Sequence, residues 1–265
     1  MSAERATASS RVQYLRGSVL VRFGNGKGER FMKQTESTHY IFFYREGSAA
    51  ERDLPLIIKE QEACCRYICQ VLRTEPDFKL RYYLCDSPEE VGRIYGDNEP
   101  CNGFAKMPDT VCAVYNEKIR CIGFHEDAHL ISYRISRPDS PAVREGLAMY
   151  FDRSWWGIDN REWTGFYLKT GRYQPVWRML DRDFFFSLDC SVSYPVMGAF
   201  TDWLISSYGM EKYLALYKAR DTAAAFSDLY GMMPEELDTS FTEYIRLFRT
   251  DSAVEKRMEE MLTSR

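Results

Sequence analysis

The sequence has no long hydrophobic run, no block of basic residues and no low-complexity linker. None of its 265 residues belongs to a stretch approaching the roughly 18 consecutive apolar residues of a membrane span, so we expect no transmembrane helix. Lysine and arginine are dispersed along a chain of net charge −4, which argues against nucleic acid as a partner. The first ten residues are polar and lack the apolar core of a secretory signal. This predicts a cytoplasmic protein, or a secreted one if a signal has been removed.

Paired cysteine motifs are also missing. The eight cysteines include no C-x-x-C pair, so a zinc site built from cysteines has little support. Cys64, Cys65 and Cys69 fall in one expected helix, where neighbouring cysteines rarely form a disulfide. We therefore interpret the cysteines mostly as small, buried apolar side chains. An apolar content of 45% suffices for a hydrophobic core and argues against a disordered chain.

Histidine is scarce as well, with three in the chain, and two of them belong to His125-Glu126-Asp127-Ala128-His129, which reads H-E-x-x-H. On a helix, residues i and i+4 lie on one face a turn apart, so both imidazoles can reach one zinc ion. Glu126 lies roughly 100° around the helix from His125 and can act as general base toward a metal-bound water. The alternative is a surface helix with two unliganded histidines. The third histidine, His39, is expected at the end of a strand.

Hydrophobic periodicity predicts an α+β fold, with strands before residue 116 and helices after residue 190. Strands are expected at 18–23, 29–33, 39–44, 78–85 and 110–115, with a hairpin turn at 24–28 and a loop at 98–109. We expect a β-rich N-terminal segment at 1–47 and a catalytic domain at 48–265.

The first long helix is expected from Ser48 to about residue 73, and its apolar stripe is interrupted only by Gln61. A proline-initiated helix follows Ser87, and the helix of the H-E-x-x-H motif is expected at 117–135. Ser140 should cap a helix that carries one carboxylate, Glu145. Further helices are expected at 194–208, 210–219, 222–230, 234–248 and 255–262.

The helix that carries the two histidines and the helix that carries Glu145 together resemble a known family. His125-Glu126-x-x-His129 and Arg144-Glu145-Gly-Leu-Ala-Met-Tyr-Phe-Asp152 are similar to the gluzincin metallopeptidases, in particular the peptidase MA-like group, which pair H-E-x-x-H with a glutamate in an E-G-x-A-x-Y helix. The resemblance extends more loosely over about residues 39–248. It implies a zincin-like fold in which His125, His129 and Glu145 bind zinc and Glu126 is the general base and acid. It also implies that Tyr194 stabilises the oxyanion.

The resemblance also bears on the substrate, which would be a peptide or protein. The aminopeptidase branch holds the substrate's amino terminus with a Gly-x-Met-Glu-Asn segment, and the nearest stretch here, 103–109, lacks the glutamate. We therefore hypothesise an endopeptidase rather than an aminopeptidase, with the strand at 110–115 offering its edge to an extended peptide. The alternative hypothesis is a regulatory or interaction module that binds zinc without turnover. The oligomeric state is left open.

Overall fold

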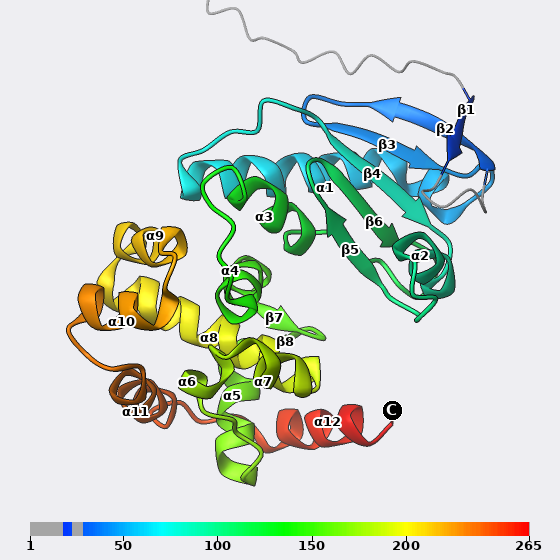
Figure 1. Ribbon diagram of the computed structural model, residues 1–265. Helices are drawn as coiled ribbons and strands as arrows, with labels where there is room; N and C mark the ends of the chain where they lie inside the picture. Colours follow the sequence, from blue (N-terminus) through cyan, green and yellow to red (C-terminus); the bar gives the residue numbers. More distant parts are fainter. Residues whose placement is uncertain (1–17, 23–28, 265) are drawn as a thin grey trace, which may run out of the picture. The chain divides into compact units, whose positions relative to one another are not determined.

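The computed structural model describes residues 18–22 and 29–264 (Figure 1). The described chain forms two compact units. The first runs to Leu130, except for the short segment Leu72–Thr74, which groups with the second; the second continues from Ile131. A mixed β-sheet dominates the first unit and helices dominate the second, so the predicted α+β class is confirmed. The hairpin turn expected at 24–28 lies outside the described residues.

The sheet of the first unit has, among the described residues, six strands in the order β1-β2-β3-β4-β6-β5 (Figure 1). In chain order they are β1 (Ser18–Arg22), β2 (Glu29–Glu36), β3 (Tyr40–Tyr44), β4 (Leu80–Cys85), β5 (Gly103–Lys106) and β6 (Thr110–Val114). The pairs β3–β4 and β4–β6 are parallel, and the other three pairs are antiparallel.

This strand order corrects one prediction. The strand expected to offer a free edge, now β6, is hydrogen-bonded to β4 on one side and to β5 on the other. Its second neighbour comes from residues 103–106, which the sequence pattern had predicted as loop, because this four-residue strand lies among glycine, proline and asparagine. The last strand at this end of the sheet is therefore β5.

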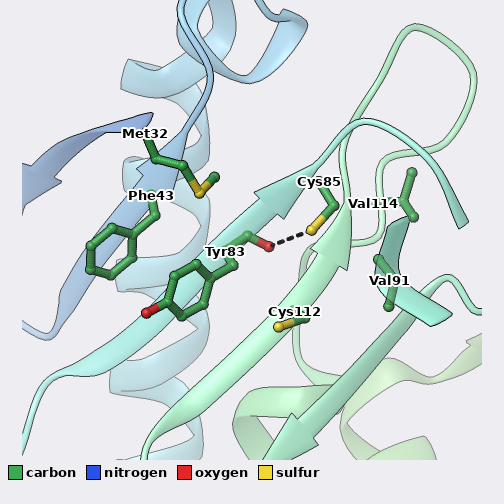
Figure 2. Packing of buried hydrophobic residues seen from close by; sticks show 7 residues of the cluster. All are labelled: Met32, Phe43, Tyr83, Cys85, Val91, Cys112 and Val114. Carbon is green, nitrogen blue, oxygen red and sulfur yellow. Dashed lines mark hydrogen bonds between the residues drawn. The ribbon is translucent and has the colours of Figure 1, made fainter. Parts of the chain in front are cut away.

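One face of the sheet carries a small hydrophobic core (Figure 2). Phe43 of β3 and Tyr83 of β4 stack with ring centroids 4.5 Å apart. Cys85 and Cys112 are buried beside them and behave as small apolar residues, as predicted. The cluster consists of Met32, Phe43, Tyr83, Cys85, Val91, Cys112 and Val114. All eight cysteines are free, and Cys190 is exposed.

Two helices of the first unit follow the sequence prediction closely. α1 (Ala49–Leu72) runs across one face of the sheet (Figure 1), and the hydroxyl of Ser48 accepts the N–H of Glu51 at its start. α2 (Pro88–Tyr95) begins with a proline, and Ser87 accepts the N–H of Glu90, as expected of a capping serine.

The helix of the H-E-x-x-H motif is shorter than predicted. α3 runs over His125–Ser132, not over 117–135. The side chain of Asn116 accepts the backbone N–H groups two and three residues ahead, at 2.8 Å each, so the chain turns there instead of starting a helix. Gly123 then has a φ of +131°, which a helix does not accommodate. The helix therefore begins at the first histidine of the motif.

The second unit is built mainly of helices around a short hairpin of β7 (Ser154–Trp155) and β8 (Ile158–Asp159). Its helices are α4 (Pro141–Asp152), α5 (Asn160–Thr170), α6 (Val176–Met179), α7 (Arg182–Ser187), α8 (Cys190–Tyr208), α9 (Met210–Lys218), α10 (Thr222–Tyr230), α11 (Pro234–Ile245) and α12 (Ser252–Thr263). Within the described part of the chain, no helix has both the length and the apolar character needed to cross a bilayer.

Two glycines allow α4 and α8 to pack closely. A Cβ added at Gly146 of α4 would lie 2.5 Å from the hydroxyl of Thr201. A Cβ added at Gly198 of α8 would lie 2.6 Å from the Cβ of Met149 and 2.5 Å from the amide nitrogen of Asn160. These distances are shorter than real Cβ contacts, so only glycine fits. The contact at Gly146 fixes the turn of α4 next to Glu145.

Candidate metal centre

The two histidines of the motif lie on one face of α3, as their i, i+4 spacing predicts. Their ring centroids are 5.0 Å apart and the rings are inclined at 85°. His129 is buried and His125 is half-buried. The third histidine is not part of this group: Nδ1 of His39 lies 2.6 Å from Oε2 of Glu62, at the start of β3.

Glu145 of α4 joins the histidine pair. One ligand atom from each of His125, His129 and Glu145 lies within 4.8 Å of the others, and the three residues could hold a metal ion. Two imidazole nitrogens and one carboxylate oxygen form a donor set that zinc uses where three protein ligands leave one position open. Imidazole ligands also suit copper, iron and nickel, so this donor set fits zinc without being specific to it.

Glu126 follows His125 on α3, and its carboxylate lies beside β5. A Cβ added at Gly103 of that strand would be 3.4 Å from Oε1 of Glu126 and 3.1 Å from Sγ of Cys121. The absence of a side chain at Gly103 therefore leaves room between the strand backbone and the carboxylate. The glutamate of the motif thus faces the last strand of the sheet.

The start of α3 is held by Gln61 of α1, a residue for which the sequence pattern predicted no role in the site. Gln61 is fully buried. Its Nε2 donates to the carbonyl oxygen of Gly123 (3.1 Å) and to Oδ2 of Asp127 (3.0 Å), and its Oε1 accepts the N–H of Gly123 (2.7 Å). The signal for this role was its position as the single polar residue of an apolar stripe.

Asp127, inside the motif, is fully buried and turned toward the sheet. Burial raises the pKa of Asp127 well above its usual range, and the nearby charge of Glu126 raises it further, against the opposing effect of a hydrogen bond with Tyr40. The Tyr40 hydroxyl is bonded both to Oδ2 of Asp127 and to the carbonyl oxygen of Gln61. Oδ2 of Asp127 accepts from the Tyr40 hydroxyl and from Nε2 of Gln61. Asp127 therefore ties α3 to Gln61 of α1 and to Tyr40 of β3.

Tyr194 belongs to the first part of α8 and is half-buried. Its ring packs against Trp155 and Phe185, with centroids 5.6 Å and 6.1 Å away. The group that could hold a metal consists of the two histidines and the glutamate. The role predicted for Tyr194 in stabilising an oxyanion stays a prediction.

Comparison with known proteins adds no relative to this geometry. The chain matches no family model, no curated protein and no solved structure. The assignment of a function therefore rests on the residues and on their arrangement.

Proposed function

We propose that this protein is a zinc-dependent metallopeptidase of the gluzincin type, in which His125, His129 and Glu145 hold the ion. The observation that carries the proposal is the convergence of their three ligand atoms, although Glu145 belongs to a different helix from the two histidines. The donor chemistry fits zinc, and the H-E-x-x-H order supplies a glutamate next to the first ligand.

When bound, zinc would lower the pKa of a coordinated water and polarise the scissile carbonyl. Glu126 is the residue that accepts the water proton and passes it to the leaving amine. Its carboxylate is half-buried beside Gly103, where a substrate backbone approaching β5 would meet it. Tyr194 donates a hydrogen bond to the developing oxyanion.

The position of β5 supports a peptide as substrate. This strand ends the sheet and pairs with β6 only along one side in the described strand order. An extended peptide can add to such an edge through main-chain hydrogen bonds. We infer an endopeptidase rather than an aminopeptidase because residues 103–109 lack the glutamate with which the aminopeptidase branch holds the substrate's amino terminus.

The test compares three variants for bound zinc and for cleavage of a diverse peptide library. Glu126→Gln keeps the size of the side chain but cannot accept a proton at neutral pH, so it should retain zinc and lose activity by about 10²–10⁴-fold. His129→Ala removes a ligand and should lose both zinc and activity. Tyr194→Phe should retain zinc and lose less activity than Glu126→Gln, because water can partly replace the phenol.

The matched control is Glu99→Gln, which makes the same chemical change at an exposed position and should leave zinc and activity unchanged. Full activity in Glu126→Gln would refute the hydrolytic mechanism. Stoichiometric zinc in the wild type with no peptide cleaved would instead favour a zinc-binding module without turnover.

A further inference from the structure

A second feature of the helical unit is an open pocket of about 740 Å³ at the start of α4 and of α10. Its walls come from three separated segments: residues 137–144, residues 180–182 at the start of α7, and residues 220–223 at the start of α10. The charged residues among its lining are Arg137, Asp139, Arg144, Arg182, Arg220 and Asp221. Four arginines against two aspartates give the pocket a formal charge of +2.

Three of the four arginines lie against neutral groups. Arg144 donates from Nη1 to the carbonyl oxygens of Pro138 (2.5 Å) and Asp139 (3.1 Å). The guanidinium of Arg137 lies 5.5 Å from the ring centre of Tyr133. That of Arg182 lies 5.1 Å from the ring centre of Phe186. These neighbours position the guanidinium groups without neutralising their charge.

No carboxylate of the described residues forms an ion pair with any of these arginines. One of the two aspartates, Asp221, is engaged in capping α10, where its Oδ1 accepts the N–H of Ala224 at 3.0 Å. Guanidinium groups gathered around one pocket repel one another over distances up to the Debye length of about 8–10 Å. The positive charge of this pocket therefore exceeds what its own carboxylates compensate.

An independent observation at the same place is the side chain of Ser140. This residue occupies the N-cap position of α4 and lines the pocket, yet its hydroxyl does not cap the helix. Ser140 is 7% exposed, and its Oγ is buried with no hydrogen-bond partner among the described residues. A buried hydroxyl without a partner costs free energy, and here it stands at the positive end of a 12-residue helix. Both features favour an acceptor with negative charge.

We propose that this pocket binds a phosphate-type dianion, with the arginines as its main ligands and the start of α4 as a further donor region. The planar guanidinium group matches phosphate oxygens through pairs of parallel hydrogen bonds, and a helix N-terminus adds favourable partial charge. The formal charge of the pocket matches a dianion. This site is separate from the proposed metal centre and does not depend on it.

The test is isothermal titration of the full-length protein with inorganic phosphate at constant ionic strength. Arg182 is the first residue of α7 and Arg220 lies in the link before α10, and both are exposed. The double substitution Arg182→Gln/Arg220→Gln should therefore leave the fold intact, as circular dichroism would check. We expect saturable 1:1 binding in the wild type and at least about tenfold weaker binding in the double variant, since removing charge-assisted hydrogen bonds weakens an anion complex. The control Arg93→Gln/Arg257→Gln removes two exposed arginines outside the pocket and should bind like the wild type.

A third variant and a second ligand sharpen the result. Asp139→Asn removes a negative charge from the lining and should strengthen phosphate binding. Succinate, a dicarboxylate of similar charge, should bind more weakly than phosphate at the same pH. Equal phosphate binding in the wild type and in Arg182→Gln/Arg220→Gln, no saturable binding in the wild type, or succinate binding as tightly as phosphate would each overturn the proposal.

Discussion

Replacing Gln61 with leucine should loosen the start of the motif helix. The side chain of Gln61 makes three hydrogen bonds, two with the backbone of Gly123 and one with Asp127, and Gln61 is fully buried. Leucine is similar in size and fills the space, but it makes none of these bonds. The substitution therefore isolates the polar role of Gln61 from its packing role.

The magnitude follows from the three bonds. A typical hydrogen bond contributes about 1 kcal/mol net, and a buried donor or acceptor left without a partner costs about 1–3 kcal/mol. Removing all three should destabilise the first unit by about 3–5 kcal/mol. For a protein of this size, a destabilisation of about 3 kcal/mol lowers the melting temperature by roughly 6–12 °C.

Hydrogen exchange measures this effect locally. The N–H of Gly123 is bonded to Gln61 Oε1 at 2.7 Å, so its protection from exchange should fall sharply in Gln61→Leu together with that of the following residues. The matched control is Gln70→Leu, the same change at an exposed position of α1, which should stay within about 0.5 kcal/mol of the wild type. Unchanged exchange at Gly123 in Gln61→Leu would refute the reasoning.

Two further predictions concern Glu62 and Gly198. Burial acts to raise the pKa of Glu62, but the hydrogen bonds from His39 and Ser37 outweigh it and lower that pKa. The charged Glu62 carboxylate therefore stabilises the fold above its unfolded pKa, and this stabilisation is lost as the pH falls through the folded pKa. Glu62→Gln should therefore cost about 1–3 kcal/mol at pH 7 and progressively less as the pH falls below the usual glutamate pKa of 4.5, measured by urea unfolding. The exposed Glu60→Gln is the control, and a pH-independent difference would contradict this. Gly198→Ala should destabilise the protein by about 1–3 kcal/mol in thermal melts, because the added Cβ overpacks against Met149. The control is Gly165→Ala, whose Cβ would meet only Ile245 at 3.7 Å and which should be neutral or stabilising. Equal effects of the two glycine substitutions would show that close packing is not the cause.

The parts of the site that follow from local geometry could be predicted from the sequence. The i, i+4 spacing places His125 and His129 on one face, and the proline-initiated pattern sets the helix that carries Glu145. The start of α3 could not be predicted, because it depends on the positive φ of Gly123 and on its two bonds with Gln61, 62 residues earlier.

Long-range arrangement explains the other differences. The sequence pattern predicts an edge strand at 110–114, but a strand's place in a sheet depends on the strand order. The short β5 that pairs with this strand lacks a clear strand pattern in the sequence. The arginine pocket is assembled from three segments between residues 137 and 223, none of which forms a basic run. Division of the chain at residue 47 into a β-rich segment and a catalytic domain stays a prediction.

The most direct measurement is anomalous scattering at the zinc absorption edge from crystals of the zinc-loaded protein. We predict one anomalous peak with a nitrogen of His125, a nitrogen of His129 and a carboxylate oxygen of Glu145 within about 2.0–2.2 Å of it. No peak at this position, or a zinc ion held by the two histidines with Glu145 turned away from it, would contradict the central claim.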